Sequence, residues 1–151
     1  MARGPLRSRY DIHSLMDAIN FEVPFDATKG AISDGEFMKW HEENTKKICH
    51  RLGVGWSTKL INVYLKTRVY LAREGRPNLQ EVIHPPIDNY LWRGIKKNFG
   101  DQPQIISLTH KVQRIKDIKS YDTYSQIISG CRLVAKQLKC TLIEVDQLWC
   151  P

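Results

Sequence analysis

The chain has 151 residues, of which 42% are hydrophobic. This suits one ordinary domain with a real core and excludes wholesale disorder. No run approaches the roughly eighteen apolar residues of a membrane span. The start, residues 1–5, is basic but lacks the apolar stretch of a secretory signal, so we expect an intracellular protein, either cytoplasmic or nuclear.

The charge balance points to polyanionic partners. The formal net charge is +7 and the isoelectric point is near 9.3. Such an excess attracts nucleic acids, and phosphate contacts that release counterions give affinity for any sequence. A basic protein with no such partner is the plain alternative.

The four cysteines, Cys49, Cys131, Cys140 and Cys150, show no CxxC spacing. We expect unpaired, buried thiols rather than disulfides. Cys49 and His50 are the only adjacent pair of soft ligands, and a structural zinc site would need a second pair. We therefore expect no metal, and the sequence indicates no cofactor.

In chain order, residues 1–32 contain the helix-breaking residues Pro5, Pro24 and Gly30. This segment therefore predicts an N-terminal arm with one short helix over 11–20. Residues 33–151 predict a single helical domain. Its first helix begins near Asp34, with Ser33 or Asp34 as N-cap, and ends near Leu52.

The Gly53-Val54-Gly55 turn then ends this helix, and Ser57 is expected to cap the next one. Residues 100–110 are expected to form a loop or a short irregular element. The fold class is all-α, a compact array of five to seven helices with a helix-hairpin-helix-like centre. The later helices are expected over 58–73, 87–98, 112–118 and 120–139, the last of these with Ser120 or Asp122 as its N-cap. A final helix is expected to be opened by a capping box from Thr141 to Glu144.

The most specific arrangement is the stretch 52–59, followed about thirty residues later by 84–92. Glycines between helices expose backbone N–H groups that can hold a phosphate. Lys59 would follow in the first turn of one helix, and Asp88 would start another that faces it. A partly desolvated lysine can attack an electrophilic carbon while a carboxylate moves protons or stabilises a cation. Alternatively, Lys59 is simply exposed and Asp88 simply stabilises a helix start.

These two segments resemble the core of the helix-hairpin-helix DNA glycosylases, most of all the 8-oxoguanine DNA glycosylase branch. Gly53-Val54-Gly55 with Thr58-Lys59 resembles the hairpin motif, and Pro86-Ile87-Asp88 with Trp92 resembles the segment that bears the catalytic aspartate. The match covers about 48 residues. The resemblance implies that Lys59 forms a Schiff base with the deoxyribose C1′ of a flipped nucleotide, and that Asp88 is the catalytic carboxylate.

Other residues around the two motifs are candidates for this site. Trp56 and Ser57 are two extra residues between the glycines and Thr58-Lys59, relative to the usual hairpin. Because this insertion changes where the lysine stands after the turn, Lys66, two turns beyond Lys59, is a rival nucleophile. Trp56, Trp92 and Tyr90 are candidates for stacking on a base, whereas Trp40 and Trp149 are assigned to the core. The expected nucleic-acid-binding residues are Gly53, Gly55, Ser57, Trp56, His84, Trp92, Lys46, Lys47, Arg51, Arg93, Lys96 and Lys97.

The sequence thus predicts a DNA glycosylase-like enzyme that flips a modified base from duplex DNA and cleaves its N-glycosidic bond. A lysine nucleophile would also permit strand cleavage by β-elimination. One alternative is a nucleic-acid-binding module without catalysis. Another is an interaction protein whose basic surface meets an acidic protein.

Overall fold

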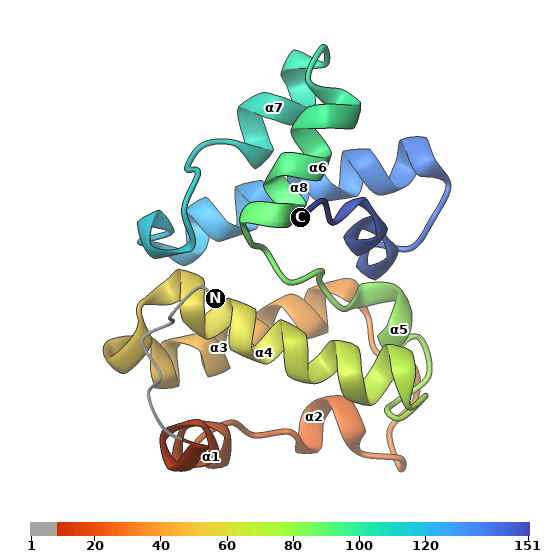
Figure 1. Ribbon diagram of the computed structural model, residues 1–151. Coiled ribbons are helices and arrows are strands. Elements are labelled where there is room, and N and C mark those ends of the chain that lie inside the picture. Colours follow the sequence, from red (N-terminus) through yellow and green to blue (C-terminus); the bar gives the residue numbers. More distant parts are fainter. Residues whose placement is uncertain (1–8) are drawn as a thin grey trace.

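The computed structural model describes the backbone of residues 9–151 and the side chains of residues 11–151. The all-α prediction is confirmed, because these residues contain helices and no strand. Figure 1 shows the helices in two halves, with α1 to α5 below and α6 to α8 above. The elements are α1 (Arg9–Asp17), α2 (Glu22–Phe25), α3 (Asp34–Leu52), α4 (Val54–Leu65), η1 (Lys66–Leu71), α5 (Leu79–Val82), α6 (Asn89–Phe99), α7 (Pro103–Thr109), η2 (Ile115–Asp117), α8 (Tyr121–Leu138) and η3 (Ile143–Leu148).

Capping residues start the long helices where the sequence predicts them. The Ser33 side chain accepts a hydrogen bond from the Glu36 backbone N–H at the start of α3, and the Ser120 side chain does the same for Thr123 at the start of α8. Each bond satisfies a backbone donor that has no partner within its helix. Gly53, with a φ of 76°, then ends α3 and turns the chain directly into α4.

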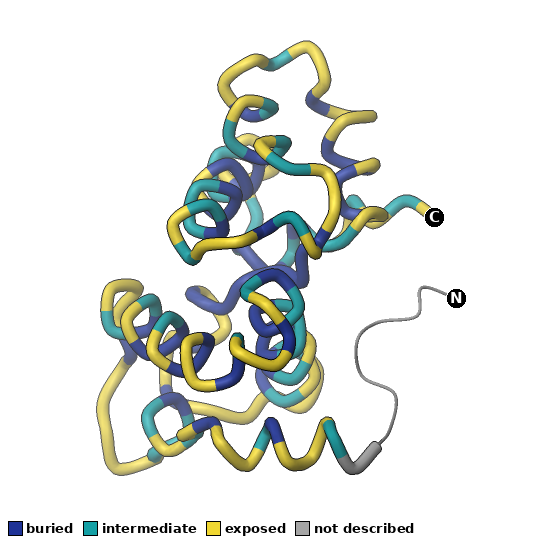
Figure 2. The backbone as a smooth tube through the Cα atoms, turned by 90° about the vertical axis from the view of Figure 1, so that its left-hand side faces the viewer, coloured by how far each residue is buried: buried dark blue, intermediate teal, exposed yellow. Residues whose placement is uncertain are grey.

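Two hydrophobic cores meet at a buried seam. The lower core gathers residues from α1, α3, α4 and α5, and the upper core gathers residues from α6, α7 and α8. The connecting segment, residues 83–87, is buried along its whole length and runs between the halves. Figure 2 shows this buried backbone where the two halves meet.

A polar cluster fills part of the seam, and its members are almost all fully buried. The His41 Nε2 atom lies 2.8 Å from the Asn62 Oδ1 atom, and the Tyr124 hydroxyl lies 2.8 Å from both Asn62 Nδ2 and His84 Nδ1. Burial lowers the pKa of His41 to about 4, and burial with the nearby His41 and Arg132 lowers the pKa of His84 well below its usual value. Both imidazoles are therefore neutral near pH 7.

Several elements differ from the sequence-based expectation. The second helix begins at Val54 rather than Thr58, so Ser57 does not cap it. Residues 103–109, expected as a loop or a short irregular element, form α7. Residues 112–118 contribute only the short 3₁₀ turn η2, and the last helix is the 3₁₀ element η3. The arm's first residues, 1–8, with their basic start, lie outside the described part of the chain.

Among residues 9–151, no helix combines the length and apolar character needed to cross a membrane. The cysteines are unpaired, as expected, but only Cys131 is fully buried, and burial raises the pKa of its thiol to about 12. Cys49, Cys140 and Cys150 are partly exposed, contrary to the expectation of four buried thiols.

Candidate functional site

Lys59 and Asp88 lie together at the seam between the two halves. Lys59 projects from the second turn of α4, and its Nζ atom lies 3.3 Å from the Asp88 Oδ2 atom. Their side chains are 25% and 15% exposed. The pair is therefore sheltered but open to solvent, which is the exposure that a reacting group needs.

The two oxygens of Asp88 have different partners. Oδ1 accepts the backbone N–H groups of Tyr90 and Leu91, each at 3.0 Å, and so caps α6. Oδ2 faces Lys59 and also accepts the Trp149 indole N–H at 3.4 Å. The cap fixes the carboxylate, because its geometry is set by the start of the helix. The other oxygen is thus held toward Lys59.

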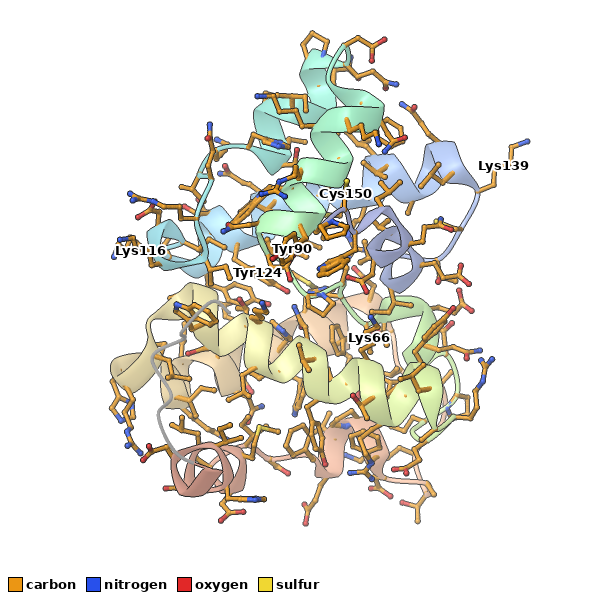
Figure 3. The ribbon with its side chains drawn as sticks, viewed as in Figure 1. Lys66, Tyr90, Lys116, Tyr124, Lys139 and Cys150 are labelled. Carbon is orange, nitrogen blue, oxygen red and sulfur yellow. The ribbon has the colours of Figure 1, made fainter. Side chains whose placement is uncertain are left out.

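A second ion pair lies beside the first. Lys66 follows Lys59 by seven residues, which places it on the same side of the helix, and it is paired with Asp146 of η3. Figure 3 shows Lys66 at the seam in the lower half, with Tyr90 across the seam in the upper half. Lys66, the rival nucleophile, therefore belongs to the same site, whereas sequence reasoning missed Asp146.

The two pairs line one continuous groove. A hollow of about 490 Å³ is bounded by both pairs and by the apolar side chains Val63, Leu71 and Trp149. This volume lies within the roughly 300–1,000 Å³ typical of ligand sites. A neighbouring hollow of about 530 Å³ shares Lys66, Leu71 and Asp146 with it.

A wide helical turn forms part of the groove wall. In η1 the backbone N–H of Ala72 bonds to the carbonyl of Thr67 at 3.1 Å, five residues back, as in a π-helix. Single π-helical turns within helices are frequent at functional sites. Lys66, Thr67 and Leu71 of this turn all line the groove, and Leu71 is 65% exposed.

The glycine turn supports packing rather than the expected phosphate contact. The Gly55 N–H donates to the Ile118 carbonyl at 3.2 Å, and a Cβ on Gly55 would lie 1.9 Å from the Ile115 carbonyl oxygen. The Gly53 N–H donates to the Cys49 carbonyl. The Gly53 carbonyl in turn accepts both the backbone N–H and the hydroxyl of Ser57. The prediction that Gly53, Gly55 and Ser57 bind phosphate is therefore corrected, because their N–H groups are used within the chain.

Two of the aromatic candidates are buried. His84 is fully buried in the polar cluster of the seam, and Trp92 is 4% exposed with its indole N–H bonded to the Thr109 carbonyl at 2.7 Å. Neither can reach a base, so both predictions are corrected. Trp56 is half-buried, with the Lys59 ammonium 5.6 Å from its ring centre.

Trp149 is the aromatic residue that the sequence interpretation misassigned. Instead of joining the core it is 45% exposed and lines the groove. It reaches Asp88 because η3 packs closely on α6 at Gly94, where a Cβ would lie 1.7 Å from the Leu148 carbonyl oxygen. In the sequence, the close approach of η3 to α6 is indicated by a glycine, Gly94, in the middle of a helix.

The predicted basic rim lies on two different helices. On α3, Lys46 pairs with Glu42 at 2.7 Å, Lys47 donates to Asn44 at 3.1 Å and Arg51 pairs with Asp11 at 3.6 Å. These three cations do not line either hollow of the groove. On α6, Arg93, Lys96 and Lys97 are exposed.

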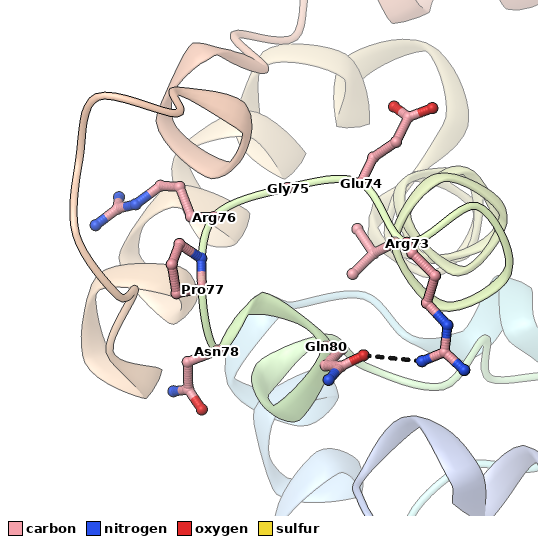
Figure 4. Close-up of a pocket in the computed structure, with 8 residues that line it drawn as sticks. Arg73, Glu74, Gly75, Arg76, Pro77, Asn78 and Gln80 are labelled. Atoms are coloured by element: carbon pink, nitrogen blue, oxygen red, sulfur yellow. Dashed lines mark hydrogen bonds between the residues drawn. The ribbon is translucent and has the colours of Figure 1, made fainter.

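A third hollow, of about 320 Å³, lies at the turn between η1 and α5 (Figure 4). Arg76, in its wall, is 4% exposed in its side chain and holds Glu36 at 2.7 Å together with carbonyls of residues 23, 30 and 31. Arg73 donates to Gln80 at 3.1 Å. These bonds fasten the segment before α3 to the turn, which is a structural role.

Within residues 11–151, no group of three or more His, Cys, Asp or Glu side chains is placed to hold a metal ion. Comparison of the chain with protein-family models, with curated proteins and with solved structures found no match. The candidate function must therefore be argued from the groove itself.

Proposed function

We propose that the chain is a DNA glycosylase-like enzyme, with Lys59 as nucleophile and Asp88 as the catalytic carboxylate. The observation that carries the proposal is the Lys59–Asp88 pair at 3.3 Å in the wall of a 490 Å³ hollow. The resemblance of segments 52–59 and 84–92 to the glycosylase core supports the same two residues. The proposal does not require the glycine turn to bind phosphate.

In this mechanism the Lys59 ammonium first gives a proton to Asp88 Oδ2 and becomes a neutral amine. The amine attacks C1′ of the flipped nucleotide, the C1′–N bond to the base breaks, and the departing base takes the proton from Asp88. The new C1′–N bond to Lys59 becomes a Schiff base when the sugar ring opens, with O4′ taking the proton that the lysine nitrogen loses. The Oδ1 cap keeps the carboxylate in position throughout.

The direct test incubates the protein with a panel of damaged and modified DNA strands and borohydride, which reduces a Schiff base to a stable adduct. We expect an adduct and base release with the wild-type protein. Lys59→Arg keeps the positive charge but cannot form a Schiff base at ordinary pH, so it is expected to give neither. No adduct and no base release across the panel would remove the proposal.

A nucleic-acid-binding module without catalysis is the second candidate. It is favoured by the cap that Asp88 makes, which by itself explains an aspartate at this position. Binding that falls steeply with salt, yet survives both Lys59→Ala and Asp88→Ala, with no base release, would favour this candidate.

A further inference from the structure

The exposed large apolar side chains gather around the groove. Val63, Leu71 and Trp149 line the first hollow, Leu71 and Leu138 line the second, and Tyr90 packs against Trp149. Among the residues with described side chains, the one other exposed large hydrophobic is Ile12, on α1. Exposed apolar surface that is concentrated and edged by charges marks a binding surface rather than chance exposure.

One end of this surface is a ladder of aromatic and cationic groups. The rings of Tyr90 and Trp149 lie 4.4 Å apart between centres, and both residues are more than a third exposed. The Arg93 guanidinium lies 5.4 Å from the Tyr90 ring centre on the same helix. The ladder thus runs from Arg93 through Tyr90 to Trp149, which borders the hollow of Lys59 and Asp88.

The ladder is held in place before any ligand binds. The Trp149 indole N–H donates to Asp88, and the Cys150 backbone N–H donates to the Tyr90 carbonyl at 3.1 Å. These bonds tie the end of η3 to the start of α6. A preorganised aromatic surface binds with less loss of conformational entropy than one that must be ordered by its ligand.

Exposed aromatic rings beside cations are the chemistry that binds unpaired nucleotides, since every base offers a flat face for stacking. A base inside a duplex has both faces covered by its neighbours and cannot use such a surface. None of the six predicted phosphate-facing lysines and arginines lines the groove, and its own cations, Lys59 and Lys66, are each paired with an aspartate. The groove therefore fits a single strand better than a double helix.

We propose that the groove binds an unpaired DNA strand, with one base stacked on the Trp149–Tyr90–Arg93 ladder. The next nucleotide lies in the hollow beside Lys59 and Asp88. The identity of the nucleotide beside Lys59 rests on the proposed glycosylase function, but the preference for a single strand does not. The substrate class would then be modified bases in single-stranded or locally open DNA.

Binding of an unmodified fluorescent oligonucleotide tests this, alone and annealed to its complement. We expect the single strand to bind at least tenfold more tightly than the duplex at equal salt. Trp149→Ala should weaken single-strand binding by about 5- to 100-fold, the range for loss of one stacked base, and should change duplex binding little. Ile12→Ala, at the exposed apolar residue away from the groove, is the matched control and should leave both unchanged.

Trp149→Phe provides a second measurement that does not depend on a large truncation. Trp40 and Trp92 are buried and Trp56 is half-buried, so the quenching of tryptophan fluorescence by the single strand that is lost in Trp149→Phe comes from Trp149, and we expect this to be more than half of the total. Arg93→Gln should weaken the single strand more than the duplex. Lys97→Gln, the same charge loss further along α6, should weaken both alike, and thermal melting should check that each variant is folded.

Equal or tighter duplex binding, or unchanged single-strand binding in folded Trp149→Ala, would overturn the proposal. Equally tight, Trp149-dependent binding of polyglutamate would also overturn it and indicate an acidic protein partner. These outcomes concern unmodified strands, so they are independent of base release. A failure of the single-strand proposal can therefore be distinguished from a failure of the glycosylase proposal.

Discussion

Two sets of polar side chains lie on neighbouring faces of α4, and their surroundings give them different roles. Asn62 faces inward to the buried cluster of His41, His84 and Tyr124. Lys59 faces outward to the groove. The inner set is neutral and closed to solvent, whereas the outer set is charged and partly exposed. The contrast indicates that the cluster stabilises the joint between the two halves, while the groove is available for chemistry.

Burial keeps the inner set neutral, and its hydrogen bonds fix which atom donates in each contact. Asn62 Oδ1 can only accept, so His41 Nε2 must donate to it, while Asn62 Nδ2 donates to the Tyr124 hydroxyl. The Tyr124 hydroxyl then donates to His84 Nδ1. Each bond fixes the direction of the next, and a proton added to either imidazole would have no buried counter-charge in the cluster.

The largest effect expected to test this contrast is at Lys59. Lys59→Ala should lower base release by at least about 1,000-fold, because it removes the nucleophile. The free energy of unfolding should change by less than about 1 kcal/mol, since a partly exposed ion pair contributes little. Single-turnover base release and urea unfolding measure the two quantities. A stability loss as large as that of a core mutant would break the distinction between the two sets.

Asn62→Ala should do the opposite. It leaves His41 Nε2 and the Tyr124 hydroxyl without their buried partner, so we expect the free energy of unfolding to fall by about 3 kcal/mol. Asn98→Ala, which removes a partly buried bond of 2.8 Å to the Gly94 carbonyl, is the control and should cost well under half as much. Urea unfolding measures both. Equal effects would show that the cluster does not stabilise the joint.

The pH dependence of stability tests the neutral state of the cluster. His41 takes up a proton at about pH 6.5 when unfolded but only at about pH 4 when folded. Stability should be complete above pH 6.5 and fall as the pH drops from 6.5 toward 4, by about 2 kcal/mol at pH 5 from His41 alone. His84 acts in the same direction.

Urea unfolding from pH 7.5 to 4.5 measures this dependence. His84→Leu removes one of the two groups and should flatten the slope, whatever its effect on stability at pH 7.5. A stability that stays level below pH 6.5 would show that the imidazoles are not held neutral.

The smallest change in stability is expected at Asp88, where two substitutions distinguish the role of Oδ1 from that of Oδ2. Asp88→Asn keeps an N-cap oxygen, so unfolding should change by about 0.5 kcal/mol or less, while Asp88→Ala should cost about 1 kcal/mol. Base release should be lost in both. Ser33→Ala removes a comparable cap from α3 and should lower stability by a similar amount with base release unchanged. Activity that survives in Asp88→Asn would limit Asp88 to capping.

Local sequence signals predicted much of this molecule. Caps at Ser33 and Ser120 and the break at Gly53 depend on neighbouring residues, and the structure has them where they were expected. Asp88 is the N-cap of α6, which begins two residues after the expected helix start at Ile87. The pairing of Lys59 with Asp88 was expected from two helix starts facing one another, but Lys59 lies in the second turn of α4 and reaches Asp88 at the seam.

The rest depends on contacts between distant segments. From the sequence, both Tyr90 and Trp92 were candidates for stacking on a base. Trp92 is buried because its indole N–H bonds to the Thr109 carbonyl of α7. Trp149 and Asp146 reach the groove only because η3 packs on α6 at Gly94. Gly55 is required by the carbonyl of Ile115 in η2 rather than by a ligand. No local pattern encodes these approaches.

The central claim is most directly tested by finding where a reduced adduct is attached. The protein would be treated with borohydride and a DNA strand from which it releases a base, then digested and analysed by mass spectrometry. The account predicts one modified residue, Lys59, in the wild-type protein, and the same site in Lys66→Ala. Modification of Lys66 in place of Lys59, or recovery of no modified lysine, would contradict it.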